Sequence, residues 1–328
     1  MIRILNEREI RNLVSLDLSA VAAVEEGFAE LARGNVLVPP IMMIPVPERQ
    51  GEVDIKSAYI HGLDRMAIKV ASGFFENYRH GLPSQSGQML VLSAETGFLE
   101  AVLLDNGYLT QVRTGAAGAV AAKYLAPREV ETVGVIGSGM QARFQMEALR
   151  LVRPFKTIRM FSLDAEADKD RYVEDMQRSL GVTVIKAPSV EAVVRESAVV
   201  VTTTPARKGY IKAEWLHPGL HITAMGSDTE EKQELQADVL AAVDLFACDL
   251  KAQSLRLGEL RSTVAANLMR ADAPVPELGA IINGEQAGRT DARQTSVCDL
   301  TGVGVQDTMI AIRALALAEE KGVGLTVL

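Results

Sequence analysis

The chain is poor in several residue types, and each shortage excludes a class of protein. Its 328 residues contain two cysteines, Cys248 and Cys298, whose spacing fits no disulfide framework or metal site, so we expect reduced, buried thiols. No apolar run reaches the ~20 residues that cross a bilayer, and the N-terminus has no signal-peptide core. The four histidines lie far apart in the sequence. We therefore expect a cytoplasmic protein that holds no metal.

Runs of positive charge are also missing. The formal net charge is −8 and no basic block stands out, which disfavours nucleic acids and anionic membranes as partners. What the chain does have is apolar residues, at 48% of the sequence. That is ample for a hydrophobic core, and the length favours two domains.

From about residue 116 onward, short apolar segments alternate with amphipathic ones such as 168–180 and 190–196. The predicted buried strands are 132–136, 157–161, 182–185, 198–203, 221–225 and 244–247. This alternation predicts a parallel sheet with helices on both faces. Six such strands match a Rossmann dinucleotide-binding fold, with a switch point above its first strand.

The first ~112 residues have a different pattern. Asp17 is placed to cap a helix over about 18–33, and Gly34 to end it. Strand-like segments follow, separated by turn signals, at 53–60, 66–71, 89–93 and 98–104. They predict an antiparallel sheet. A last helix at about 307–321 can pack back on this α+β domain. The predicted division is therefore 1–112 with about 307–328, and 113–306.

A glycine-rich turn, Gly137-Ser138-Gly139-Met140-Gln141-Ala142, follows the first predicted strand of the second domain. The first glycine permits a tight turn, and the second lets a pyrophosphate approach the backbone. The alanine lets the next helix pack close to the strand. Free N–H groups at the start of that helix would hold the phosphates. The alternative is an ordinary strand-to-helix turn.

Other predicted cofactor contacts follow from strand ends. Folds that bind NAD place an acidic residue about 20 positions past the glycine turn. Here Ser162 stands at that spacing and Asp164 comes slightly later, while no arginine follows at once to hold a 2′-phosphate. The cofactor is therefore NAD or NADP, with NAD favoured. Residues after the fourth and fifth strands are expected to line the nicotinamide side; they are Thr202, Thr223, Ala224, Met225 and Gly226.

Three ionisable residues are candidates for chemistry. Lys69 lies within an apolar strand, and buried lysines are rare unless paired; the alternative is a lysine that snorkels at a sheet edge. Arg113 lies at the domain junction, where a guanidinium grips a carboxylate or phosphate, or forms an interdomain salt bridge. Asp228 follows the fifth strand, where ligands bind, and either transfers a proton or caps a helix.

Several stretches together resemble the ornithine cyclodeaminase/mu-crystallin family. They are 67–70, 109–117, the glycine turn, 221–228 and 299–302, in the family's order over nearly the whole chain. The resemblance implies a Rossmann domain joined to a substrate-binding and dimerisation domain. It also implies that Lys69 and Arg113 bind the substrate carboxylate and that Asp228 transfers the proton. Arg113, its neighbour Thr114 and Ser84 then fall at cofactor-contacting positions.

One segment departs from the cyclodeaminase pattern. Ornithine cyclodeaminases carry a further arginine in the first domain that clamps the substrate carboxylate, whereas 38–43 here is Val-Pro-Pro-Ile-Met-Met. This segment, with 51–56, is similar to the ectoine-utilization EutC branch. The polar residues Glu52, Asp54 and Lys56 are candidates for contacts with a differently shaped substrate, or form a charged surface strand.

Two classes of function remain open at this point. The first is an NAD(P)-dependent enzyme acting by hydride transfer at the α C–N bond of an amino acid. It would be a cyclodeaminase of a diamino acid, such as one from ectoine breakdown, or an imine reductase or amino-acid dehydrogenase. The second is a non-catalytic binding protein of mu-crystallin type. We expect a homodimer, because the strands of the first domain leave a sheet edge that needs covering.

Overall fold

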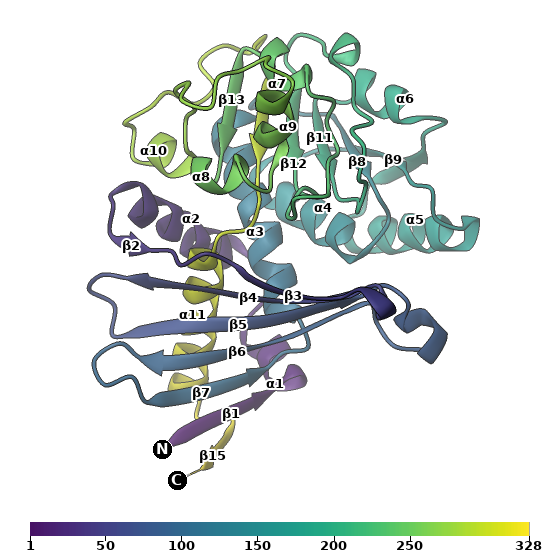
Figure 1. The fold of residues 1–328 in the computed structure, drawn as a ribbon. Coiled ribbons are helices and arrows are strands. Elements are labelled where there is room, and N and C mark those ends of the chain that lie inside the picture. Colours follow the sequence, from purple (N-terminus) through teal and green to yellow (C-terminus); the bar gives the residue numbers. More distant parts are fainter. Residues whose placement is uncertain (328) are drawn as a thin grey trace. The chain divides into compact units, whose positions relative to one another are not determined.

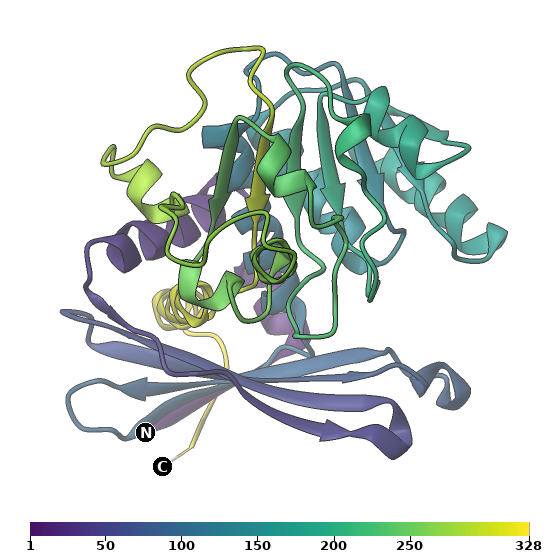
Figure 2. The same ribbon diagram turned by 45° about the horizontal axis from the view of Figure 1, so that its top comes forward.

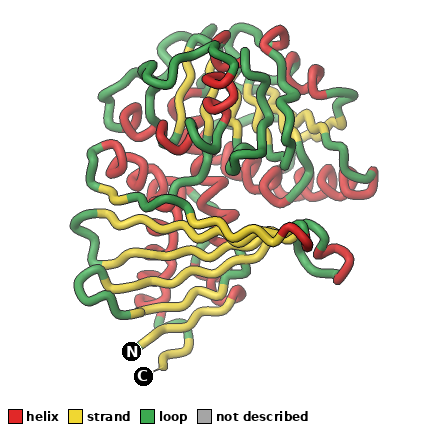
Figure 3. Tube along the Cα trace, viewed as in Figure 1, coloured by secondary structure: helices red, strands yellow, loops and turns green. Residues whose placement is uncertain are grey.

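A computed structural model describes residues 1–327 of the chain. The chain divides into two compact units. The first unit comprises Met1–Arg113 and the segment from Val303 onward, and the second unit comprises Thr114–Gly302. The first unit is therefore discontinuous in sequence. Helices and strands of both units are distinguished in Figure 3.

The first unit is built on an eight-stranded sheet in the order β15-β1-β7-β6-β5-β4-β2, with β3 paired to β4. The strands are β1 (Ile2–Asn6), β2 (Val36–Leu37), β3 (Met42–Val46), β4 (Gly51–Ile60), β5 (Arg65–Phe74), β6 (Gln85–Ser93), β7 (Leu99–Leu104) and β15 (Leu325–Val327). Neighbouring strands are antiparallel except β1 and β7, which are parallel. The four predicted strands correspond to β4, β5, β6 and β7, which are antiparallel as predicted, whereas the parallel strand β1 was not predicted.

Two long helices pack together in this unit. Helix α2 (Leu18–Ala32) begins where predicted, because the Asp17 carboxylate accepts hydrogen bonds from the N–H groups of Ser19 and Ala20, both at 2.9 Å. Helix α11 (Gly304–Lys321) lies across β4 and β5 and against α2 (Figures 1 and 2). The C-terminal helix thereby covers the apolar face of a sheet formed mainly by the first hundred residues.

The second unit contains a seven-stranded parallel sheet in the order β10-β9-β8-β11-β12-β14-β13. Its strands are β8 (Thr132–Ile136), β9 (Thr157–Phe161), β10 (Thr183–Lys186), β11 (Val199–Thr202), β12 (His221–Ala224), β13 (Leu245–Cys248) and β14 (Ser296–Asp299). The chain reverses its direction of sheet growth between β8 and β11, which makes this the switch point of a Rossmann fold. The seventh strand, β14, was not predicted; it inserts between β12 and β13.

The remaining helices connect these strands. They are α1 (Glu7–Leu13), α3 (Tyr108–Leu125), α4 (Met140–Val152), α5 (Glu166–Leu180), α6 (Val190–Arg195), α7 (Val239–Ala242), α8 (Lys251–Ser254), α9 (Glu259–Ala265) and α10 (Leu278–Ile282), with short 3₁₀ turns at Pro47–Arg49, Asn77–His80 and Ala213–Trp215. Between residues 1 and 327, none of the helices combines the length and apolarity that crossing a membrane requires.

The sheet of the second unit is buried on both faces. One hydrophobic cluster includes Trp215 and Leu220, and the other includes Phe155 and Tyr172. Cys248 and Cys298 lie inside the fold as free thiols. Because side chains cover both faces, ligands can reach this sheet only at strand ends, and the carboxyl ends are where its loops carry polar residues.

Candidate functional site

The glycine turn joins β8 to α4 and suits a bound pyrophosphate. Gly137 has φ of 112°, which side chains rarely adopt, and a Cβ there would lie 2.6 Å from Thr203 Oγ1. A Cβ on Gly139 would meet no heavy atom within 4 Å, so the turn faces open space. Gly139 is the N-cap of α4 and no side chain caps that helix. The first N–H groups of α4 are thus available to an anion.

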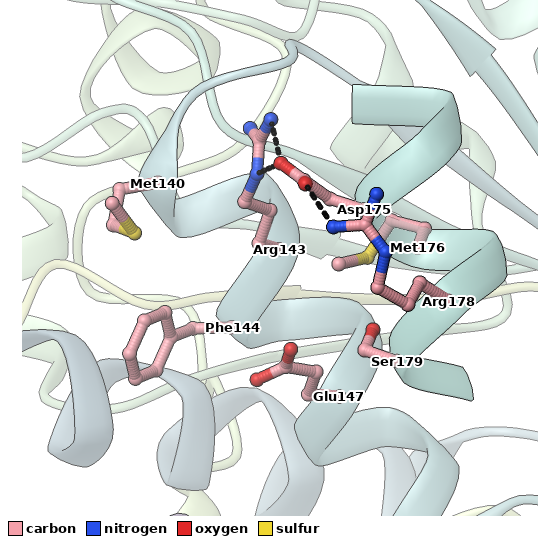
Figure 4. Close-up of a pocket in the computed structure, with 8 residues that line it drawn as sticks. All are labelled: Met140, Arg143, Phe144, Glu147, Asp175, Met176, Arg178 and Ser179. Atoms are coloured by element: carbon pink, nitrogen blue, oxygen red, sulfur yellow. Dashed lines mark hydrogen bonds and ion pairs between the residues drawn. The ribbon is translucent and has the colours of Figure 1, made fainter. Parts of the chain in front are cut away.

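Arg143 of α4 also holds the glycine turn in place, through hydrogen bonds to its backbone. Its guanidinium donates hydrogen bonds to the carbonyl oxygens of Ser138 at 2.5 Å and Gly139 at 3.2 Å. It also binds the carboxylate of Asp175 on α5 at 2.8 and 3.0 Å (Figure 4). Because the Arg143 guanidinium binds these carbonyl oxygens, the N–H groups of the turn remain available to a ligand.

A hollow of about 320 Å³ lies between α4 and α5, and Arg143 and Asp175 belong to its lining (Figure 4). None of the residues at the carboxyl ends of the strands lines it. A nicotinamide ring belongs at those strand ends in this fold, so the hollow is not its site.

The end of β9 carries an acidic group at the ribose position of such folds. The Asp164 carboxylate accepts a hydrogen bond from Ser162 Oγ at 2.6 Å and a short one from Ser138 Oγ. The N–H of Asp164 in turn donates to Ser162 Oγ at 3.1 Å. The structure thus brings together three of the predicted cofactor residues, with Asp164 fixed beside the glycine turn.

The carboxyl ends of β11 and β12 are tied together by a buried acid that sequence reasoning missed. Glu234 accepts hydrogen bonds from Thr202 Oγ1 at 2.5 Å, from Thr204 N and Oγ1 at 2.7 Å, from Gly226 N at 2.7 Å and from Tyr210 Oη at 2.8 Å. Burial raises the pKa of Glu234, against these hydrogen bonds. The acid therefore fixes the loops that follow two adjacent strands.

The predicted nicotinamide-lining residues divide into buried and accessible groups. The side chains of Thr202, Thr223 and Ala224 are buried, and the Thr223 hydroxyl lies 3.0 Å from His221 Nε2. Met225 and Gly226 are partly exposed. Any contact from the buried residues would therefore be made by backbone atoms, while Met225 and Gly226 present their surface to a ligand.

Asp228 lies two residues past Gly226, in a loop that stays non-helical. Its carboxylate accepts a hydrogen bond from Lys232 Nζ at 2.7 Å, and its side chain is 42% exposed. The next residues form a turn rather than a helix, so the helix-capping alternative is wrong. The preceding Ser227 donates to the buried Glu259 at 2.6 Å, which anchors the loop. Asp228 is thus an accessible carboxylate on a braced loop.

In the first unit, Lys69 and Arg113 meet at one carboxylate. Lys69 is on β5, an interior strand, and its side chain is only 2% exposed, so the snorkelling alternative is wrong. Lys69 Nζ lies 3.0 and 3.1 Å from the two carboxylate oxygens of Asp307, and Arg113 Nε lies 2.9 Å from one of them. All three side chains are buried. While Lys69 is protonated, two cations and one anion leave this cluster with one positive charge.

The pKa values in this cluster follow from burial and charge. Burial, then repulsion from Arg113, lowers the pKa of Lys69 to about 7, while attraction to Asp307 opposes the change; Lys56, its neighbour on β4, adds repulsion. Burial alone would raise the pKa of Asp307, but attraction to Arg113 and Lys69 outweighs it and the pKa is lowered. Asp307 is therefore ionised, and the site favours a further anion.

The other predicted residues lie apart from these clusters. Ser84 is exposed at the edge of the β5–β6 hairpin, where its carbonyl accepts a hydrogen bond from Phe74 N at 2.7 Å. The carbonyl of Thr114 accepts one from Gln145 Nε2 at 2.8 Å, within the second unit. Gln141 is in the first turn of α4. Glu52, Asp54 and Lys56 share one face of β4, and of these Lys56 is buried beside Lys69.

Sequence comparison identifies the family. A profile of the ornithine cyclodeaminase/mu-crystallin family matches residues 2–320, and the chain belongs to this family. An uncharacterised cyclodeaminase of Sinorhizobium fredii, y4tK, is 46% identical over 323 residues, covering 98% of this chain and 97% of that one.

Two solved structures share the fold over the whole chain. The Thermococcus litoralis Δ1-pyrroline-2-carboxylate reductase, in complex with NADH and L-proline, superposes with a TM-score of 0.93 at 27% identity, covering 99% of this chain and all of the other. An archaeal alanine dehydrogenase dimer with bound NAD gives 0.91 at 32% identity, covering 100% and 99%. The mixed α/β fold with a Rossmann unit is thus that of nicotinamide-dependent enzymes, and the chain is an enzyme of this family.

Proposed function

We propose that this enzyme transfers a hydride between NAD and the α-carbon of an amino acid or its 2-imino form, as an imine reductase or amino-acid dehydrogenase. The observation that carries the proposal is the buried Lys69–Asp307–Arg113 cluster, which has one excess positive charge while Lys69 is protonated. A buried cation without a full counter-charge is costly, and a substrate carboxylate relieves that cost. Relatives named as a dehydrogenase and a reductase support the same reaction class.

Each candidate residue has a separate task in this reaction. Lys69 and Arg113 bind the substrate carboxylate and so fix the position of the α-carbon. Asp228 gives a proton to, or takes one from, the substrate nitrogen, a role its accessible carboxylate suits. Bound NAD supplies or accepts the hydride. The glycine turn and the uncapped start of α4 would hold its phosphates.

NAD rather than NADP is the cofactor we propose. Asp164 is held at the end of β9 by the hydroxyls of Ser138 and Ser162. A carboxylate there accepts hydrogen bonds from ribose hydroxyls and repels a 2′-phosphate. Both solved relatives described above contain NAD or NADH.

A second candidate is a cyclodeaminase, which removes hydride from a diamino acid, lets the side-chain amine attack the imine, releases ammonia and returns the hydride. The 46% identity to a protein named a cyclodeaminase favours it. Similarity of 38–43 and 51–56 to the EutC branch points to a diamino acid from ectoine breakdown as its substrate. The absence of arginine from 38–43 argues against L-ornithine itself.

The two candidates differ in whether the cofactor turns over. Purified enzyme should be assayed with NADH against Δ1-pyrroline-2-carboxylate, iminosuccinate, and pyruvate with ammonia. It should also be assayed with NAD against L-ornithine, L-lysine and L-2,4-diaminobutyrate. A reductase or dehydrogenase changes the absorbance of reduced nicotinamide continuously. A cyclodeaminase releases ammonia with no net absorbance change at steady state. If no substrate yields either signal, the proposed function is wrong.

We also propose that the enzyme is a homodimer that assembles through the β3 side of the first unit. The support is a group of exposed apolar side chains there, together with the dimeric alanine dehydrogenase among the relatives. The exposed residues, on β2 and β3, are Leu37, Met42, Met43 and Ile44. Light scattering should give twice the monomer mass, and Ile44→Glu should reduce it to the monomer. A monomeric wild-type enzyme would exclude this assembly.

A further inference from the structure

Asp307 is a buried acid to which neither the sequence motifs nor the proposed chemistry assigns a role. It lies in the first turn of α11 and its side chain is 0% exposed. Its two oxygens contact Lys69 Nζ at 3.1 and 3.0 Å, and one of them contacts Arg113 Nε at 2.9 Å. These three residues come from α11, β5 and α3, so Asp307 joins three separate elements.

The physical need for this acid follows from the two cations. Two buried positive groups that share one site repel each other, and each also loses its hydration. A carboxylate between them reduces both costs, and the N-terminus of α11 adds a favourable field for its negative charge. The other charged groups that face Lys69 are Lys56 on β4, which repels it, and Asp105 ahead of α3, which attracts it.

We propose that Asp307 is a positioning residue, which holds the Lys69 ammonium and the Arg113 guanidinium in one fixed arrangement so that the substrate carboxylate meets two preset cations. Asp307 lies 2.9 Å from Nε of Arg113, so its charge holds the guanidinium beside the Lys69 ammonium. This inference rests on the proposed carboxylate-binding role of the two cations. It adds that their acid partner, which touches no substrate, sets the affinity for substrate.

The test compares Asp307→Asn with Thr308→Val. The first keeps the shape of the side chain and removes its charge. The second is the matched control, because Thr308 is the adjacent buried residue of α11 and its hydroxyl donates to the carbonyl of Ala58 at 2.9 Å, away from the cations. The kinetic probe is Δ1-pyrroline-2-carboxylate with NADH, measured from pH 6 to pH 9.

Asp307→Asn should raise KM by about 10- to 100-fold at pH 7, the loss expected for charge-assisted contacts that are no longer held in place. The effect on kcat should be smaller. Without Asp307, burial and Arg113 lower the pKa of Lys69 further, and of the groups named above only Asp105 still opposes them. The alkaline fall of kcat/KM should therefore move to lower pH by about one unit or more. Thr308→Val should lower thermal stability and leave both KM and the pH profile unchanged. An Asp307→Asn enzyme with the wild-type KM and pH profile would overturn the proposal, as would the same shifts in Thr308→Val.

If Asp307→Asn is too unstable to assay, the double variant Lys69→Met/Asp307→Asn provides a second test, by its melting temperature. Removing both members of a buried pair is less damaging than removing one, so the double variant should melt at a higher temperature than Asp307→Asn. A lower melting temperature would refute the pairing. Failure of every substrate in wild-type assays would instead overturn the proposed function and the role toward substrate, while the melting comparison would still report whether Asp307 is the counter-ion of Lys69.

Discussion

The variant Asp164→Asn tests whether the cofactor ribose lies beside Asp164, because it should change the preference of the enzyme for NAD over NADP. The carboxylate is exposed and is held by Ser138 and Ser162 beside the glycine turn. At ~5 Å and an effective dielectric constant of ~40, two unit charges repel by about 1.7 kcal/mol. A phosphate with about two charges doubles this to about 3 kcal/mol, or roughly 100-fold in affinity for NADP.

The same variant weakens binding of NAD. A hydrogen bond from a ribose hydroxyl to a carboxylate contributes about 1.5–3 kcal/mol, and an amide oxygen recovers only part of it. NAD should therefore bind about 10-fold more weakly, and the ratio of kcat/KM for NADH over NADPH should fall by about a thousandfold in total. Initial rates with both cofactors measure this ratio.

A matched control is Asp168→Asn on α5, where the exposed aspartate lies 3.5 Å from Arg171. It removes the same charge from the same unit, but its carboxylate pairs with Arg171 and not with the serine hydroxyls beside the turn, so it should leave the ratio within about twofold because exposed pairs are weak. An unchanged ratio in Asp164→Asn, or equal changes in both variants, would refute the placement of the ribose beside Asp164.

Three further predictions follow from the other sites. Asp228→Asn should lower kcat by about 100- to 10,000-fold and leave NADH affinity, measured by fluorescence titration, nearly unchanged; unaltered turnover would leave a binding protein of mu-crystallin type as the better account. Gly137→Ala should abolish NADH binding and destabilise the fold by more than ~1 kcal/mol in urea unfolding, since its φ is 112° and its Cβ would lie 2.6 Å from Thr203; normal binding would contradict this. The pKa of Lys69 is lowered from 10.5 to about 7, so between these pH values the unfolded chain binds one more proton than the folded chain. The free energy of unfolding should therefore increase with pH over that window. The gain should disappear in Lys69→Met, and identical slopes for the two proteins would rule it out.

Sequence periodicity located the strands of the second unit well. Strands β8 and β9 have the predicted bounds, because a strand buried on both faces is a continuous apolar run. Strand β14 was not predicted, because two of its four residues, Ser-Val-Cys-Asp, are polar. Several of their polar atoms have distant partners, as when Ser296 Oγ donates to the carbonyl of Leu125 at 2.9 Å, and no local pattern reveals such a partner.

The candidate site was predictable where residue type alone signals chemistry. Lys69 stood out as a charge inside an apolar strand, and the glycine turn stood out by its spacing. Asp307 did not, since an acid at the start of a helix is common and favourable in itself. Glu234 also did not, because four of its five hydrogen bonds come from Thr202, Thr204 and Tyr210, which are distant in sequence. Partners supplied by tertiary folding are what a linear pattern cannot show.

The split of the first unit between the two ends of the chain constrains how a newly made chain can fold. During synthesis, β4 and β5 leave the ribosome more than two hundred residues before α11, the helix that covers them. Until then the ammonium of Lys69 lacks its partner Asp307 and the sheet face stays exposed to water, so the early sheet cannot reach its final packing. Thr114–Gly302, by contrast, is complete beforehand. Chains that end at Gly302 and are released from the ribosome should therefore show protease resistance in this central part and sensitivity in the preceding one.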